Sequence, residues 1–149
     1  MIRSVLVVCT GNICRSPFGE RLLARACPVL RVESAGLGAV IGAPADSTTS
    51  EIAAHKFGID LASHVARAFT VDIGQDHDLI LAMEKHHRSD ILHHWPQLSG
   101  RVMLFDHWTG AKGIDDPYRR PAAFHTRVMS DIARAADAWA MQLTPRTPT

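Results

Sequence analysis

Residues 2–17 read IRSVLVVCTGNICRSP, and this stretch decides the fold. Its first part, residues 2–8, consists largely of β-branched and other apolar residues, which is typical of a strand covered on both faces. A helix is expected to start at Ser16 and Pro17, because the N–H that proline lacks has no partner in a first helical turn. The stretch therefore predicts a central parallel strand, a short loop and a helix.

Strand and helix patterns alternate along the rest of the chain. Three further strands are expected at residues 29–34, 79–83 and 102–105. Helices are expected from Ser16 to Pro28, from Thr48 to Gly58, from Met83 to about Trp95, and from about Pro121 to the C-terminal tail. Four strands that alternate with four helices predict a single α/β domain, with a four-stranded parallel sheet and helices on both faces.

Local signals define the ends of these elements. Thr48 followed by Glu51 is the pattern of a capping box, and Gly58 is placed to end the same helix. Gly36 and Gly38 open a long loop after the second strand, and we expect this loop to line a site.

Size and charge narrow the class of protein. The chain has 149 residues, and residues 1–143 are expected to form one domain, followed by a disordered, Thr- and Pro-rich tail at 144–149. Sixteen Lys and Arg residues against fifteen Asp and Glu give a formal charge of +1. No global field therefore attracts nucleic acid or an anionic membrane, and any anion binding is expected to be local.

Apolar runs and cysteines indicate the compartment. Residues 5–9, the longest purely apolar run, are too few to span a bilayer and lie too close to Met1 for a signal peptide. Three cysteines do not make a disulfide framework and suggest a reducing compartment. We therefore expect a cytoplasmic protein without membrane insertion.

The loop after the first strand has the composition of an anion-binding site. Ligands of parallel sheets collect at the carboxyl ends of the strands, where successive backbone N–H groups can surround a tetrahedral oxyanion. Cys9 at the mouth of this loop would feel those amides, the helix dipole and the Arg15 guanidinium, all of which favour thiolate over thiol. Because a guanidinium can hold two phosphate oxygens at once, we expect Cys9 as nucleophile and Arg15 as phosphate ligand.

The other loop residues support this interpretation. The expected cradle residues are Thr10, Gly11, Asn12, Ile13, Cys14 and Ser16. Gly11 and Asn12 are residue types that tolerate a left-handed backbone, and Ser16 can cap the helix or hydrogen-bond a thiolate. The alternative is a Cys9 that merely ends a strand as a small buried hydrophobe. A nucleotide P-loop is excluded, because no Gly-Lys-Ser/Thr follows the glycine.

Residues 5–17, VLVVCTGNICRSP, closely resemble the signature of the low-molecular-weight protein tyrosine phosphatases. Residues 34–39, 83–85, 102–105, 107–108 and 116–119 resemble the bacterial branch of this family, which accompanies exopolysaccharide-export tyrosine kinases. The resemblance implies a flavodoxin-like fold without a flavin, with strand order 2-1-3-4. It also implies hydrolysis of phosphotyrosine through a phosphocysteine, on an autophosphorylated tyrosine kinase of exopolysaccharide or capsule export.

The same resemblance assigns roles to individual residues. It makes Cys9 the nucleophile and Arg15 the phosphoryl ligand, while Ser16 steadies the thiolate. Asn12 shapes the loop with the help of His64, for which a surface histidine in a connecting loop is the alternative.

A general acid is expected outside the cradle, since expelling a phenolate with a parent pKa of about 10 requires a proton. Asp115 and Asp116 lie in the loop before the last helix, at the same side of the sheet as Cys9. The family's Asp-Pro pair maps onto Asp116, which implies that Asp116 is first the acid and then the base for water. The alternative is a turn in which Asp-Asp-Pro merely starts the final helix.

Three residues resemble the walls of the family's substrate slot, namely Ile13, Val40 and Tyr118. Ordinary packing is the alternative for each of them. A valine at position 40 departs from the large aromatic residue of some relatives.

The other cysteines give weaker signals. By resemblance, Cys14 can form a reversible disulfide with Cys9 under peroxide, and the alternative is a plain packed thiol. Cys27 is expected to be structural.

Histidines in the third helix raise the question of a metal. His87, Asp90 and His94 share one helical face and could in principle bind zinc or nickel, but we expect a solvated helix face. The predicted reaction requires no metal and no cofactor.

Two other functions remain open at this point. A thiol-dependent arsenate reductase on the same fold needs relay cysteines near the third strand, and residues 78–94 contain none. A module that binds phosphotyrosine or phosphate without turnover would leave Cys9 and Asp116 without a role. We therefore expect a phosphatase whose partner is a phosphotyrosine protein.

Overall fold

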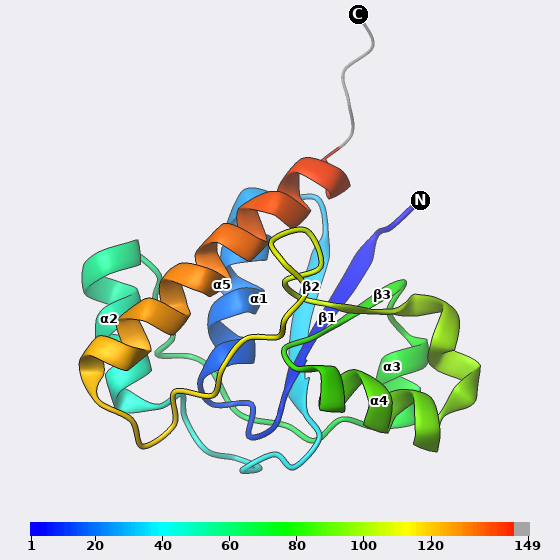
Figure 1. The fold of residues 1–149 in the computed structure, drawn as a ribbon, viewed down its shortest axis with the longest axis horizontal. Helices are drawn as coiled ribbons and strands as arrows, with labels where there is room; N and C mark the ends of the chain where they lie inside the picture. The colour runs from blue at the N-terminus through cyan, green and yellow to red at the C-terminus, as the bar shows by residue number, and fades with distance from the viewer. Residues whose placement is uncertain (145–149) are drawn as a thin grey trace, which may run out of the picture.

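Four parallel strands form the central sheet of the computed structural model, which describes residues 1–144 (Figure 1). The strands are β1 (Ser4–Cys9), β2 (Arg31–Gly36), β3 (Leu79–Ala82) and β4 (Val102–Leu104). Their order is β2-β1-β3-β4, and every neighbouring pair is parallel. The predicted α/β class, the single domain and the strand order 2-1-3-4 are confirmed.

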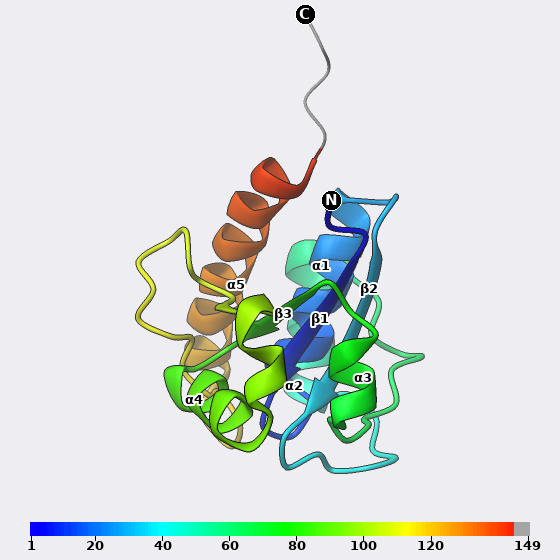
Figure 2. The same cartoon turned by 90° about the vertical axis from the view of Figure 1, so that its right-hand side faces the viewer.

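Helices cover both faces of this sheet (Figure 1 and Figure 2). In the described part of the chain they are α1 (Arg15–Ala26), α2 (Ser47–Phe57), α3 (Val71–Gln75), α4 (Lys85–His94) and α5 (Ala122–Leu143), with a 3-10 helix at Pro96–Arg101. Helices α1, α2 and α5 lie on one face, and α3 and α4 lie on the other. The predicted two-sided architecture therefore holds.

Strand β1 separates two apolar cores because successive side chains point to opposite faces of a sheet. Val5 and Val7 belong to the core under α1, α2 and α5. Leu6 and Val8 belong to the core under α3 and α4. All residues of β1 are buried, as expected for a central strand.

Some predicted details of the helices were wrong. Helix α3 is missing from the prediction. It is only a single short turn, capped by Thr70, whose side chain accepts a hydrogen bond from the backbone N–H of Ile73. Asp46 rather than Thr48 caps α2, because the Asp46 carboxylate accepts the backbone N–H of Thr49 at 3.0 Å. Gly58 ends α2 in the left-handed conformation, as predicted.

The last helix has an apolar face, in which Val128, Ile132, Ala135 and Trp139 are buried and Phe124 is partly buried. Thr144 ends α5, and its backbone N–H bonds to the Ala140 carbonyl at 2.9 Å. The rest of the predicted disordered tail, residues 145–149, lies outside the described residues. None of the helices described is long and apolar enough to cross a membrane.

Candidate active site

The loop between β1 and α1 surrounds a pocket at the carboxyl end of the sheet. This pocket has a volume of about 170 Å³. It is lined by Cys9, Thr10, Gly11, Ile13, Cys14, Arg15, Gly38, Val40, Asp116 and Tyr118. The first strand-to-helix junction and the loop around Gly38 thus meet the segment that carries Asp116, although these parts are far apart in the sequence.

Asn12 holds the cradle in shape from inside the protein. It is fully buried and has a φ of 58°. Its side-chain N–H groups donate to the hydroxyls of Ser16 at 2.8 Å and Ser34 at 3.0 Å. Its side-chain oxygen accepts the backbone N–H of Arg67 at 2.9 Å, and the His64 ring bonds to its backbone carbonyl at 2.6 Å. The loop is therefore fixed before any ligand arrives.

The expectation of a left-handed backbone was wrong for Gly11, because its φ is not positive. The glycine that the cradle needs is Gly36 at the end of β2. A Cβ at this position would lie 2.4 Å from the backbone oxygen of Thr10. Because glycine has no Cβ, the Gly36 backbone can pack directly against the loop that carries Cys9.

Gly36→Ala is expected to lower the free energy of unfolding by about 1–3 kcal/mol, the usual cost of overpacking, and to reduce turnover by displacing the loop. Gly100→Ala is the control, since a Cβ there would meet nothing within 4 Å and Gly100 lies outside the pocket. Urea unfolding and an aryl phosphate assay measure the two effects. Equal behaviour of the two variants would contradict this account of the loop.

The sulfur of Cys9 lies at the floor of the pocket, where β1 ends. Its Sγ lies 2.8 Å from the Ser16 hydroxyl oxygen, and the residue is 2% exposed. Because Asn12 donates to the Ser16 oxygen, the Ser16 hydroxyl hydrogen is free to point at the sulfur. Ser16 does not cap α1, which begins at Arg15. Its hydroxyl is instead placed to donate to a thiolate.

The Arg15 guanidinium is buried beside the cradle and anchored on one side. Its Nη1 donates to Glu84 Oε2 and to the Ile114 carbonyl, both at 2.7 Å. Its Nη2 lies 3.6 Å from Asp116 Oδ2. The anchors fix the plane of the guanidinium and leave Nη2 directed toward the carboxylate at the pocket.

Sequence reasoning gave no role to Glu84, although residues 83–85 were matched to the family. Partial burial opposes ionisation of this carboxyl, but the hydrogen bond and the charge of Arg15 lower its pKa. Glu84 is therefore an ionised partner that keeps Arg15 in place. Only the three-dimensional contact between positions 15 and 84 reveals this.

His87 is the residue whose predicted environment was wrong. It is 1% exposed, while Asp90 and His94 are exposed as expected. Its Nδ1 accepts the backbone N–H of Glu84 at 3.1 Å, so the proton of the neutral ring is on Nε2 and donates to Thr10 Oγ1 at 2.8 Å. His87 thus links the first turn of α4 to the residue after Cys9.

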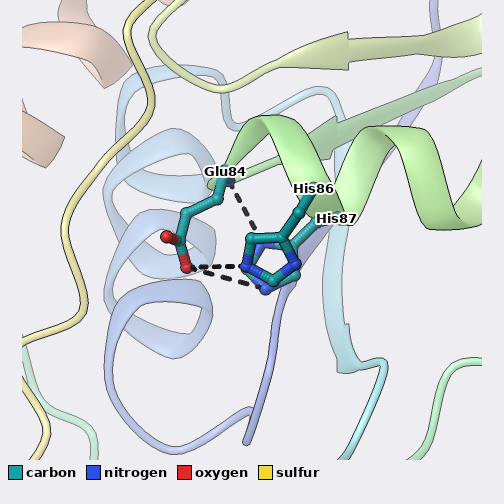
Figure 3. Close-up of side chains that lie close together, drawn as sticks. All are labelled: Glu84, His86 and His87. Atoms are coloured by element: carbon teal, nitrogen blue, oxygen red, sulfur yellow. Dashed lines mark hydrogen bonds and ion pairs between the residues drawn. The ribbon is translucent and has the colours of Figure 1, made fainter.

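Burial, followed by the nearby charges of Arg15 and His86, lowers the pKa of His87 to about 4. Figure 3 shows the carboxylate of Glu84 beside the rings of His86 and His87, and the ligand atoms of the three residues lie within 4.8 Å of one another. Three such atoms could hold a metal ion. The Arg15 guanidinium already bonds to this carboxylate and opposes a second cation there.

The pKa of His87 predicts a specific pH dependence of stability. Below about pH 6.5 the His87 ring takes up a proton in the unfolded state, whereas in the folded state it stays neutral down to about pH 4. The free energy of unfolding therefore decreases as the pH falls through this window. We expect wild type to lose about 2 kcal/mol more unfolding free energy than His87→Gln between pH 7 and pH 5. Urea titrations at both pH values measure this difference. Equal losses in the two proteins would contradict a neutral, buried His87.

The two candidate acids, Asp115 and Asp116, make different contacts. Asp116 is half-exposed at the pocket, where its Oδ2 faces Arg15 and its Oδ1 accepts the backbone N–H of Tyr118 at 3.0 Å. Asp115 is turned away, and its carboxylate lies 3.6 Å from the Arg127 guanidinium. Asp116 is therefore the carboxyl placed to exchange protons with a ligand above Cys9.

The three predicted slot residues all line the pocket. Ile13, Val40 and Tyr118 provide an apolar and aromatic surface around its mouth, and the latter two are partly exposed. An exposed tyrosine side chain beside Asp116 is not part of either core. This placement favours contact with a ligand over ordinary packing.

The cysteines of the described chain are all free thiols. Burial, the largest cause, raises the pKa of Cys14 to about 12, so it stays protonated at neutral pH. Cys27 is buried at the end of α1, next to Thr144. A peroxide-induced bond between Cys9 and Cys14 stays a prediction.

A larger cavity of about 380 Å³ lies between α4 and β4. It is lined by Lys85, Arg88, Ser89, Val102, Met103, Leu104 and His107. This cavity has basic side chains but neither a thiol nor a carboxyl group, so the smaller pocket at Cys9 is the reactive one.

Comparisons with known proteins agree with the geometry of this pocket. The family model described as low molecular weight phosphotyrosine protein phosphatase matches residues 4–147. The low molecular weight protein-tyrosine-phosphatase Etp of Escherichia coli (strain K12) is 43% identical over 140 residues, which are 94% of each chain. The probable low molecular weight protein-tyrosine-phosphatase AmsI of Erwinia amylovora is 46% identical over 139 residues, 93% of this chain and 96% of AmsI.

Among solved structures, the tyrosine phosphatase Wzb from Escherichia coli K30 in complex with sulphate superposes with a TM-score of 0.93. The two chains are 41% identical, and the match covers 97% of this chain and 100% of Wzb. The loop that surrounds the pocket at Cys9 thus belongs to a chain that is similar to these enzymes along nearly its whole length. This protein belongs to the low molecular weight phosphotyrosine protein phosphatases, a family of hydrolases.

Proposed function

We propose that this protein hydrolyses phosphotyrosine in a partner protein through a phosphocysteine intermediate, in the cytoplasm and without a metal. The observation that carries the proposal is the placement of Cys9 Sγ at the floor of a pocket that Arg15 and Asp116 border. The physiological partner we propose is an autophosphorylated tyrosine kinase of exopolysaccharide or capsule export. This partner rests on the resemblance of residues 83–85 and 116–119 to the bacterial branch of the family.

In the first step, the Cys9 thiolate attacks phosphorus in line with the tyrosine oxygen. A sulfur–phosphorus bond forms while the phosphorus–oxygen bond breaks, and the departing oxygen takes a proton from Asp116. Arg15 and the loop amides hold the equatorial oxygens, where negative charge develops. The anchored guanidinium supports this role, since it needs little reorganisation.

In the second step, water attacks the phosphorus of the phosphocysteine. Asp116, now ionised, accepts the proton of this water, and the sulfur–phosphorus bond breaks. The Ser16 hydroxyl at 2.8 Å donates to the thiolate that is released, which makes sulfur a better leaving group. Inorganic phosphate then leaves, and the site returns to its starting state.

The two rival functions have less support. An arsenate reductase would require relay thiols beside Cys9, but Cys14 stays protonated and Cys27 lies at the far end of α1. A binding module has no use for an acid at the pocket mouth, whereas Asp116 is held there by Arg15. Hydrolysis gives Cys9, Arg15 and Asp116 each a role in one reaction.

A turnover assay with paired phosphopeptides tests the proposal. We expect hydrolysis of a phosphotyrosine peptide but little of the matching phosphoserine peptide, because Cys9 is buried and a short side chain reaches it poorly. EDTA should have no effect, and vanadate should compete. Tight binding of the phosphotyrosine peptide without release of phosphate would instead favour the binding module.

The partner is tested separately with an autophosphorylated tyrosine kinase of exopolysaccharide export. Loss of its phosphotyrosine with wild type, and not with Cys9→Ser, would support this substrate. Hydrolysis of the peptide but not of the kinase would leave the activity intact and remove the proposed partner.

A further inference from the structure

We propose that Asp106 is a positioning residue, which holds the segment before Asp116 so that the acid faces the pocket. The inference rests on the proposed function of Asp116. Residues 105–121 connect β4 to α5 without a helix or strand. A loop of this length requires internal anchors to keep one side chain in a productive place.

The Asp106 carboxylate is the main anchor of the first half of this loop. The residue is 4% exposed, and its Oδ2 accepts the backbone N–H groups of Lys112 and Gly113, both at 3.0 Å. Its backbone carbonyl accepts the N–H groups of Thr109 at 3.0 Å and Ala111 at 2.9 Å. One residue therefore closes the turn at both its side chain and its main chain.

The anchored turn leads directly into the active site. Gly113 lies against the backbone of Glu84, and the next residue, Ile114, donates its N–H to the Met83 carbonyl at 2.7 Å. The Ile114 carbonyl accepts from Arg15 Nη1 at 2.7 Å. Because Asp116 follows only two residues later, the position of Gly113 limits where the acid can lie.

Packing around Asp106 leaves room for the loop to move once the anchor is lost. A cavity of about 290 Å³ borders Asp106, Lys112 and Gly113, as well as Asp131 and Arg134 of α5. Asp106 Oδ1 is buried and has no hydrogen-bond partner among the described residues. Of the two carboxylate oxygens, Oδ2 is the one that bonds to the turn, so an asparagine oxygen in its place can accept the same two N–H groups.

Leaving-group dependence distinguishes a displaced acid from general damage. Phenyl phosphate releases a basic phenolate that needs a proton, whereas 2,4-dinitrophenyl phosphate releases an anion that leaves without one. We expect Asp106→Ala to lower kcat/KM for phenyl phosphate by about 10- to 100-fold, and that for 2,4-dinitrophenyl phosphate by less than about threefold. Asp106→Asn should rescue phenyl phosphate turnover to within about threefold of wild type.

Two further variants complete the design. Asp106→Ser keeps a buried polar group that is too short to reach both N–H groups, and it should show the same selective loss if Asp106→Ala fails to fold. Asp131→Ala is the control, since Asp131 borders the same cavity and its carboxylate accepts a hydrogen bond from Arg134 on the same helix.

An equal loss with both substrates, or no loss in either Asp106→Ala or Asp106→Ser, would overturn the inference. Asp116→Ala is measured alongside. If Asp116→Ala shows the selective loss and the Asp106 variants do not, the positioning role fails while the proposed acid stands. If Asp116→Ala shows no leaving-group dependence, the acid itself is wrong, and the inference falls with it.

Discussion

Cys9→Ser is expected to reduce turnover of an aryl phosphate by about 10⁵- to 10⁶-fold, the usual effect of removing an essential nucleophile. A serine hydroxyl stays protonated where the thiolate would form, and the neighbouring Ser16 is placed to donate a hydrogen bond to it rather than to remove its proton. The two side chains are close in size, so the cradle and its anchors should remain. Phosphate release under saturating substrate measures the loss.

The control is Cys27→Ser, which changes a buried thiol at the other end of α1 and should keep turnover within about threefold. Cys9→Ser should still bind vanadate or phosphate, because Arg15 and the loop amides are unchanged. Undiminished turnover in Cys9→Ser would remove the covalent mechanism altogether.

Asp116→Ala is expected to lower kcat/KM for phenyl phosphate by about 10²- to 10⁴-fold, the range associated with a positioned general acid. The physical reason is the basic phenolate, which cannot leave the phosphorus without a proton. Arg15 loses its 3.6 Å contact with Asp116 but keeps Glu84 and the Ile114 carbonyl, so substrate binding should change little.

Asp115→Ala is the matched control, because the adjacent carboxylate pairs with Arg127 outside the pocket. Its kcat/KM should stay within about threefold of wild type. A large loss in Asp115→Ala together with almost none in Asp116→Ala would exchange the roles of the two carboxyl groups.

Much of the fold could be predicted because its signals are local and strong. The apolar run of β1 and the helix start at residues 15–17 are typical of a buried strand and a proline-initiated helix. The alternation of strands and helices was sufficient to predict the parallel sheet, and the family resemblance predicted the order of its strands. Helix α3 was missed because five residues are too few to show a helical period.

The caps illustrate a limit of pattern reading. Thr48 and Glu51 have the spacing of a capping box, but Asp46 lies two residues earlier and offers a carboxylate to the same helix. Several capping residues in a row compete, and the path of the preceding loop decides which one is used.

The candidate site was predicted unevenly for a similar reason. Cys9 and Arg15 lie in one short loop, so their proximity is visible in the sequence. Glu84 and His87 reach the same loop only through the pairing of β3 with β1, which brings the start of α4 beside Thr10. Contacts of this kind depend on the tertiary fold and leave no local pattern.

His87 shows how burial reverses an expectation based on composition. A helix rich in histidine and charged residues suggests a solvated face, and Asp90 and His94 lie on one. His87 instead faces the cradle, where the Glu84 N–H and the Thr10 hydroxyl satisfy both ring nitrogens. The neutral ring costs no burial of charge, which explains why a histidine is tolerated there.

The central claim is that the sulfur of Cys9 carries the phosphoryl group during turnover. The most direct measurement mixes Asp116→Ala with 2,4-dinitrophenyl phosphate, stops the reaction with denaturant within the first turnover, and determines the masses of the proteolytic peptides. We predict one phosphoryl group on the peptide that contains Cys9, in an amount equal to the initial burst of dinitrophenolate. A burst with an unmodified Cys9 peptide, or a phosphoryl group on another residue, would contradict the account.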